Sequence, residues 1–151
     1  MKKIKGLLVV IGILLIVGCG KSVKEVKSIN DFNNVATEKG LVVSDNIANY
    51  NASYIKEATI ASLDDLEIEM IVYDNEDSAN KIQDEHINSF MVRKSANMVT
   101  KKYSGSNYYK YTMITNGYYF VSSRVENTLI FTKTDVKNKE IVDSILDSLG
   151  Y

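Results

Sequence analysis

Hydrophobic and polar residues follow two different periods along the chain after residue 27. Apolar residues recur at steps of three and four in three segments, as on one face of a helix. Between these segments apolar and polar residues alternate, as in strands with one buried face. The predicted helices are 28–40, 74–93 and a last one from 135 or 137 to 149; the predicted strands are 41–47, 55–63, 66–73, 98–103, 108–114, 118–125 and 128–134.

Short turns join most of these strands. Asn116-Gly117 between alternating residues is the strongest hairpin signal, because both residue types tolerate the positive φ of a tight turn. Asp64-Asp65 and Glu126-Asn127 indicate two further turns of this length. The order helix, three strands, helix, four strands, helix has no strand–helix–strand alternation. It predicts a single α+β domain, with an antiparallel sheet of six to seven strands and helices packed on one face.

Counting outward from the Asn116-Gly117 turn indicates which side chains share a face of the sheet. Met113 then pairs with Phe120, and their face, which Phe131 joins, is predicted to be buried. The opposite face is unusually apolar for one exposed to solvent, and large exposed apolar patches mark contact surfaces. The residues proposed on this ground as a partner-binding face are Tyr108, Tyr119, Val121 and Ile130.

Two alternatives to this partner-binding face stay open. Tyrosines and β-branched residues also suit a pleated strand without any binding role. If the face is covered by other elements instead, the Asn-rich loop 46–53 is the next candidate for an interface.

The first eighteen residues have a pattern of their own. Lys2, Lys3 and Lys5 precede an uncharged, mostly aliphatic run from Gly6 to Gly18. A membrane-spanning helix needs about 20 apolar residues, so this shorter run is typical of the hydrophobic part of a signal peptide. The lysines would stay on the cytoplasmic side, which places the rest of the chain outside. An uncleaved N-terminal anchor helix is the alternative.

Cys19 is the only cysteine of the chain, and it ends the segment Ile16-Val17-Gly18-Cys19. This segment resembles the lipobox of bacterial lipoproteins. The resemblance implies a diacylglycerol on Cys19, cleavage between Gly18 and Cys19, and a lipid anchor on the extracytoplasmic face of the cell membrane. The expected organisation is a removed signal peptide at 1–18, a lipidated cysteine with a polar tether at 19–27, and one domain at 28–151.

Charge and cysteine content restrict what the exported part can do. Removal of residues 1–18 takes away three of the 18 basic residues and leaves 15 against 19 acidic ones. This balance disfavours binding of nucleic acid through a basic surface. With a single cysteine, no disulfide can form within the chain.

Signals for catalysis and for metal binding are weak. Asp74, Glu76 and Asp77 lack the glycine and the last glutamate of a calcium loop. Asp84-Glu85-His86 lacks the second histidine of a zinc-binding helix, and His86, the only histidine, lies on the apolar face of its helix. We expect no metal and no cofactor. The acidic residues that leave a hydrolase as an alternative are Asp64, Asp65, Glu67 and Glu69.

The sequence therefore predicts a membrane-anchored, extracytoplasmic lipoprotein that serves the cell envelope as a non-catalytic binding or accessory module. Its expected partners are the membrane, through Cys19, and an envelope protein or small ligand. A structural subunit of a membrane complex and an envelope hydrolase using surface carboxylates are the alternatives.

Overall fold

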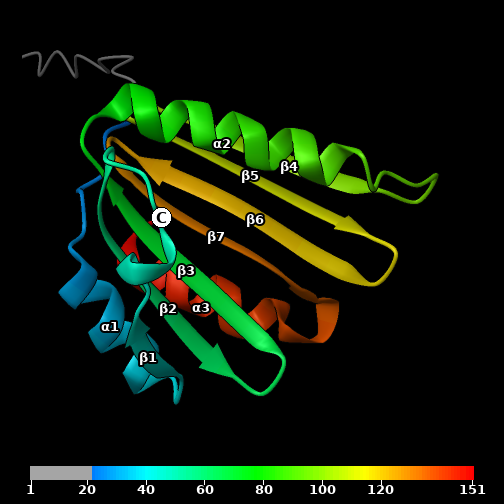
Figure 1. Ribbon diagram of the computed structural model, residues 1–151. Coiled ribbons are helices and arrows are strands. Elements are labelled where there is room, and N and C mark those ends of the chain that lie inside the picture. Colours follow the sequence, from blue (N-terminus) through cyan, green and yellow to red (C-terminus); the bar gives the residue numbers. More distant parts are fainter. Residues whose placement is uncertain (1–21) are drawn as a thin grey trace, which may run out of the picture.

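Residues 22–151 are described by a computed structural model, in which seven antiparallel strands and three α-helices follow one another as shown in Figure 1. The proposed signal peptide, Gly18 and the proposed lipidation site Cys19 lie outside these residues. Within residues 22–151, no helix is long and apolar enough to cross a membrane.

The elements are α1 (Ile29–Glu38), β1 (Val42–Asp45), the 3-10 helix η1 (Ile47–Asn49), β2 (Ile55–Leu63), β3 (Leu66–Tyr73), α2 (Glu76–Met91), β4 (Val99–Ser104), β5 (Tyr108–Thr115), β6 (Tyr118–Val125), β7 (Thr128–Asp135), η2 (Val136–Asn138) and α3 (Lys139–Leu149).

The sheet consists of two meanders joined side by side. Its strand order is β1-β2-β3-β7-β6-β5-β4. After β3, α2 carries the chain to the far edge, and the second meander returns until β7 pairs with β3, where Met70 stands opposite Ile130. The predicted antiparallel α+β domain of six to seven strands is confirmed.

Tight turns and helix caps fix the local structure. Asn116 and Gly117 have φ values of 51° and 78°, and the flanking register is as predicted, with Met113 opposite Phe120. Ser28 caps α1, because its hydroxyl accepts from the Asp31 amide while the Asp31 carboxylate accepts from the Ser28 amide. At α2 the cap is Asn75, whose side chain accepts from the Ser78 amide at 2.8 Å.

Helices cover both faces of the sheet, which corrects the expectation that they lie on one. Phe120 on β6 packs against Phe90 of α2, with ring centroids 4.9 Å apart. Its neighbour Val121 points to the other side, where it joins a core that includes Phe32 of α1 and Ile145 of α3. The strands are apolar on both sides because both sides are core.

This arrangement also corrects the proposed partner-binding face. Val121 and Ile130 are 0% and 1% exposed beneath α1 and α3, so neither is available to a partner in this structure. Tyr119 is buried as well, and Tyr108 is half-buried. Tyr73 of β3 is buried in the core that contains Ala79 of α2.

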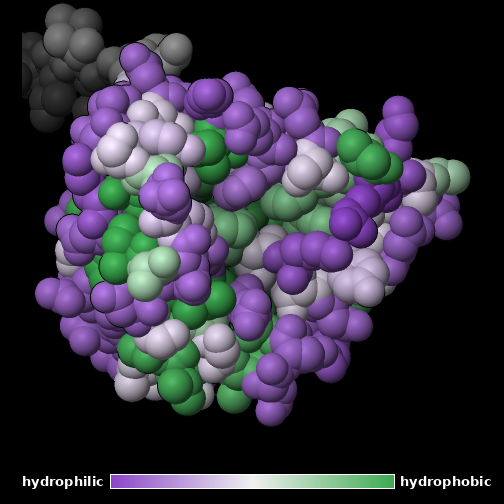
Figure 2. Space-filling model, in the orientation of Figure 1, coloured by the Kyte–Doolittle hydropathy of each residue, from purple (hydrophilic) through white to green (hydrophobic). Residues whose placement is uncertain are grey.

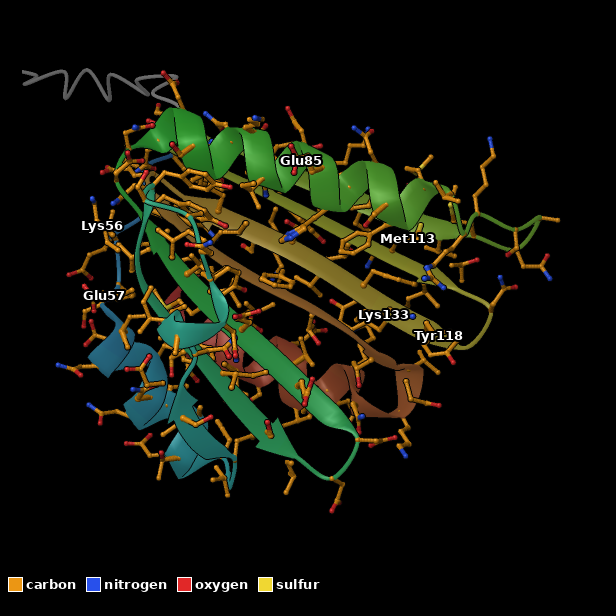
Figure 3. The ribbon with its side chains drawn as sticks, in the orientation of Figure 1. Lys56, Glu57, Glu85, Met113, Tyr118 and Lys133 are labelled. Carbon is orange, nitrogen blue, oxygen red and sulfur yellow. The ribbon has the colours of Figure 1, made fainter. Side chains whose placement is uncertain are left out.

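The outer surface on the α2 side is mixed (Figure 2). Hydrophilic residues dominate over α2, and hydrophobic residues come to the surface mainly at the lower left of the view, over α1 and β1. Val42 of β1 is 75% exposed. Side chains on this side follow the same division (Figure 3): Glu85 lies on the outward side of α2, whereas Met113 lies beneath it and is fully buried.

Candidate binding groove

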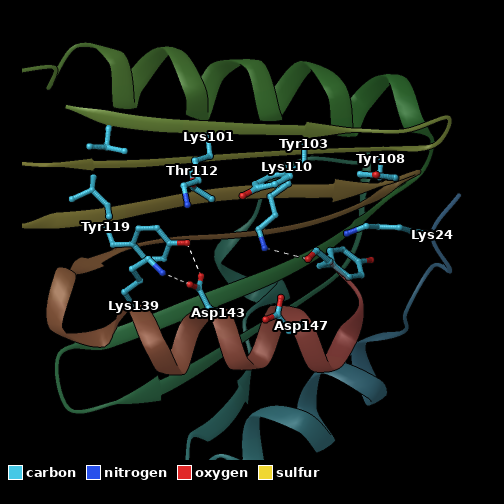
Figure 4. Close-up of a pocket in the computed structure, with 13 residues that line it drawn as sticks. Lys24, Lys101, Tyr103, Tyr108, Lys110, Thr112, Tyr119, Lys139, Asp143 and Asp147 are labelled. Carbon is cyan, nitrogen blue, oxygen red and sulfur yellow. Dashed lines mark hydrogen bonds and ion pairs between the residues drawn. The ribbon is translucent and has the colours of Figure 1, made fainter. Parts of the chain in front are cut away.

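A groove of about 540 Å³ lies on the α3 side of the sheet, between α3 and strands β4 and β5 (Figure 4). Alternation along β5 turns Lys110, Thr112 and Ile114 to this side. Asp143 and Asp147 of α3 stand one helical turn apart and form the opposite wall. The groove therefore arises where β4 and β5 continue beyond the area that α3 covers.

Positive charges outnumber negative ones along this groove. Its acidic residues are Asp143 and Asp147. Its basic residues are Lys24, Lys101, Lys110 and Lys139, and its aromatic residues are Tyr103, Tyr108, Tyr119 and Tyr151. Such a lining can bind an anion by charge and a carbon skeleton by ring contacts.

Asp143 is already neutralised by its neighbours. The Tyr119 hydroxyl donates to Asp143 Oδ1 at 2.6 Å, and Lys139 forms an ion pair with the other carboxylate oxygen. Burial acts to raise the pKa of Asp143, but the hydrogen bonds from Lys139 and Tyr119 outweigh it and hold the pKa below the usual value. Burial and the bond to Asp143 raise the pKa of Tyr119. This triad closes one end of the groove and leaves no free carboxylate there.

Lys110 lies in the middle of the groove, among charges of both signs. Its Nζ donates to the main-chain oxygen of Tyr151 at 3.2 Å. Burial lowers the pKa of Lys110, although Asp143 and Asp147 act in the opposite direction. An ammonium group with such surroundings favours the arrival of an anion.

The other end of the groove is closed by Lys24, which belongs to the segment predicted as a polar tether. The Lys24 ammonium lies 4.6 Å from the centroid of the Tyr108 ring. Burial lowers its pKa, with Asp147 opposing. The side chain amide of Asn107 brackets the Lys24 backbone, accepting from its N–H at 2.9 Å and donating to its carbonyl at 2.8 Å. The segment after residue 21 is therefore docked on the domain.

A glycine makes this docking possible. A Cβ added at Gly105 would overlap the ring of Tyr108 and the carbonyl oxygen of Ser22. The Ser22 carbonyl accepts from the Ser106 amide at 3.0 Å, and its hydroxyl shares a 2.8 Å hydrogen bond with the Tyr108 hydroxyl. In the sequence Gly105 resembles an ordinary turn glycine, and only the close approach of the two backbones distinguishes it.

The groove contains two of the four residues of the proposed partner-binding face. Tyr108 and Tyr119 line it, whereas Val121 and Ile130 belong to the core beneath. Sequence reasoning missed the lysines, because Lys24 lies in the assumed tether. Strand alternation places Lys110 on the same side as Tyr108, so the sequence contained a signal from which Lys110 could have been assigned to this face.

His86 lies on the opposite side of the sheet, where it serves packing. Its ring centroid lies 4.2 Å from that of Phe131, and burial lowers its pKa, with Glu85 opposing. Its buried Nδ1 has no hydrogen-bond partner among the described residues.

The carboxylates of the hydrolase alternative are placed on the β2–β3 hairpin, away from the groove. Asp65 pairs with Lys137 at 2.7 Å, and Glu69 accepts from the Tyr50 hydroxyl at 2.6 Å. Asp64 and Glu67 are exposed. Their positions give them no shared concave site in the described grooves.

The remaining candidates from the sequence have structural roles. Glu76 pairs with the buried Arg124 at 2.7 Å, and Asp74 accepts from the Ser78 hydroxyl at 2.9 Å. In the loop 46–53, Asn46 and Tyr50 both donate to Glu69 of β3. Across residues 22–151, no group of three or more potential ligands is arranged to hold a metal ion.

Comparisons with known proteins assign no activity. No protein-family model matches the chain, and no curated protein matches it. One solved structure that matches is described as a GTP binding regulator from Thermotoga maritima, at 15% sequence identity and a TM-score of 0.47, with 82% of this chain and 87% of that chain covered. The role of the groove is therefore inferred from its own residues.

Proposed function

We propose that this protein is a lipid-anchored, extracytoplasmic binding module of the bacterial cell envelope, and that the groove between α3 and β5 is its ligand site. One observation carries the proposal. Lys24 forms a wall of the groove and follows Cys19, the only cysteine, by five residues. Anchor and site are therefore adjacent, so a ligand in the groove is held next to the membrane surface.

The groups in the groove suit binding more than bond cleavage. Lys110 and Lys24 supply charge, and Tyr103 and Tyr108 supply ring faces and hydroxyls. His86, the only histidine available as a general base, lies on the other side of the sheet. A shaped site with fixed cations and rings can hold a small molecule without changing it.

The anchor is tested by changing Cys19→Ser in the full chain. Only the cysteine sulfur can form the thioether, so we expect loss of labelled fatty acid and a shift out of the detergent phase. A serine variant that still incorporates fatty acid would show that the anchor is elsewhere.

The site is tested by asking what the full chain retains after purification from native membranes in mild detergent. Mass spectrometry of the extracted protein should find a small molecule that Lys110→Met loses and Lys102→Met keeps. Lys102 is the matched control, because it lies on the same hairpin but faces Tyr111 on the α2 side. Equal contents in all three proteins would contradict a ligand site in the groove.

A further inference from the structure

We infer that the ligand of this groove carries a phosphate group, held by the ammonium groups of Lys24, Lys101 and Lys110, which all line it. The inference rests on the proposed function and adds the chemical class of the ligand. Figure 4 shows Lys24 entering the groove from the tether at the right, Lys110 from β5 near the middle, and Lys101 on β4 further to the left, beside Thr112.

The first step is the distribution of charge. The described residues carry 14 lysines and arginines against 19 aspartates and glutamates, so the domain as a whole repels anions. The groove reverses this balance with four lysines against Asp143 and Asp147. Since Asp143 already accepts from Tyr119 and Lys139, the excess of positive charge falls on the Lys24 and Lys110 end.

The second step is the kind of cation. Lysine binds phosphate as a compact point charge with three donors, whereas the planar fork of arginine binds a carboxylate or a phosphate through two parallel hydrogen bonds. The chain has two arginines, Arg93 and Arg124, and neither lines the groove. Several separate ammonium groups around one space suit the multiple oxygens of a phosphate.

The third step is what lies beside the cations. Tyr103 stands directly opposite Lys110 across β4 and β5, and the Tyr108 ring lies beneath the Lys24 ammonium. Val99 and Ile114, which also pair across the two strands, extend the lining with apolar surface. The ligand therefore joins a phosphate to a carbon skeleton, such as glycerol or a sugar, that packs on tyrosine rings.

Two sources offer this chemistry: the headgroup of an anionic phospholipid and a soluble phosphate ester. The docked tether leaves two residues between Ser22 and Cys19, so the three steps along the chain reach about 10 Å when extended. A headgroup of the anchoring membrane is thus within reach, and a soluble ester can enter the groove from the open side.

The first experiment titrates the lipidated full chain, in a neutral detergent, with sn-glycerol 3-phosphate by calorimetry. Glycerol and glycerate serve as neutral and carboxylate probes of similar size. We expect the phosphate ester alone to bind well, and Lys110→Met to weaken its binding about tenfold or more, since hydrogen bonds to charged groups are the strong ones. Equal affinity for glycerate or glycerol, or an unchanged Lys110→Met, would overturn the inference.

A second pair of variants, at exposed positions, tests whether a change in affinity comes from the groove itself and not from altered folding. Lys101 and Lys102 are both exposed neighbours on β4, but Lys101 faces the groove and Lys102 faces away from it. Lys101→Met should weaken binding of sn-glycerol 3-phosphate several-fold, with Lys102→Met unchanged. If both variants change the affinity alike, the effect is general surface charge and the inference fails.

The source of the phosphate is identified in nanodiscs of phosphatidylcholine with or without phosphatidylglycerol. If phosphatidylglycerol lowers the apparent affinity for sn-glycerol 3-phosphate in the wild type but not in Lys110→Met, the headgroup occupies the groove. If it has no effect, the natural ligand is a soluble ester. Both results support phosphate recognition.

Failure of the inference is distinguishable from failure of the proposed function. A retained molecule that Lys110→Met loses but that contains no phosphorus would leave the groove a ligand site and remove the phosphate. If no molecule is retained and none of the three probes binds, both the site and its chemistry are wrong.

Discussion

Lys110 combines a cost in stability with a role in binding. Because burial lowers its pKa, the folded protein releases this proton more readily than the unfolded chain, whose lysine pKa is near 10.5. Between the two pKa values the unfolded state binds more protons, so the stability of the wild type rises with pH in that window. Below this pH window the charged, partly buried Lys110 lowers the stability of the folded protein by a constant amount.

Two results should follow for Lys110→Met in urea denaturation without ligand. At neutral pH the free energy of unfolding of the variant should equal that of the wild type or exceed it by up to about 1 kcal/mol. The reason is that a charged side chain is replaced by an apolar one of similar length. The difference should shrink as the pH is raised toward 10.5. A difference that stays constant from neutral to alkaline pH would show that Lys110 is not penalised by burial.

His86 should affect the stability of the protein at acidic pH. Burial beside Phe131 lowers its pKa below the ordinary 6.5, so the unfolded chain takes up a proton first as the pH falls. Stability should therefore decline as the pH drops below 6.5. In His86→Leu this part of the decline should disappear, whereas the parts due to carboxylates remain. Identical pH profiles for the two proteins, measured by urea denaturation, would contradict the assignment.

At the residue scale the sequence identified apolar character correctly but not its exposure. Val121 and Ile130 were recognised as one apolar face, yet alternation alone cannot tell whether a helix covers that face. Gly105 and Asn107 looked like ordinary turn residues. Their contacts with Ser22 and Lys24 span more than eighty positions of the chain, so no local pattern could reveal them.

Among the elements, α3 is where the sequence pattern was most informative. The apolar residues that recur at steps of three and four in this helix include Val142, Ile145 and Leu149, and all three are buried against the sheet. Ile145→Ala should lower the free energy of unfolding by about 2 to 5 kcal/mol, because it leaves a cavity in a close-packed core. Ser144→Ala, on the neighbouring position, should change it by about 0.5 kcal/mol or less. Urea denaturation of both variants checks the difference.

The docked tether is a further element, one that periodicity could not show because it has no regular structure. Asn107→Ala removes both hydrogen bonds to the Lys24 backbone without changing a residue that lines the groove. Trypsin should then cleave after Lys24 and Lys27 several-fold faster, since proteolysis follows local opening. Urea midpoints should fall only slightly. If Asn107→Ala and the wild type are cleaved at the same rate, the segment is not held by this turn.

For the whole molecule, the sequence predicted the fold class and the element order but not the sheet topology. Hairpins are set by turns such as Asn116-Gly117, whose register depends on neighbours in the chain. The pairing of β3 with β7 depends on how α2 spans the sheet, and nothing in either strand specifies it. The second helical layer follows from that crossover, which explains why both faces became core.

The same long-range arrangement sets how the anchored molecule should stand on its membrane. With Ser22 held at the β4–β5 turn, the lipid proposed on Cys19 can be only about 10 Å from that turn. The end of β4 near Ser104 should therefore face the bilayer, and the far end, where α2 stops at Met91, should point away (Figure 1).

Cysteine labelling can measure this orientation, because Cys19 is the only native cysteine and its sulfur would be acylated. A fluorophore on Lys102→Cys, near the docked turn, should be quenched by spin-labelled lipid headgroups at least about twofold more than one on Val92→Cys, which lies beyond α2 and is 85% exposed. Adding Asn107→Ala should reduce the difference, since it frees the tether and lets the domain tumble. Equal quenching at both positions in the otherwise wild-type protein would mean that the domain has no fixed orientation and that the groove is not held against the membrane.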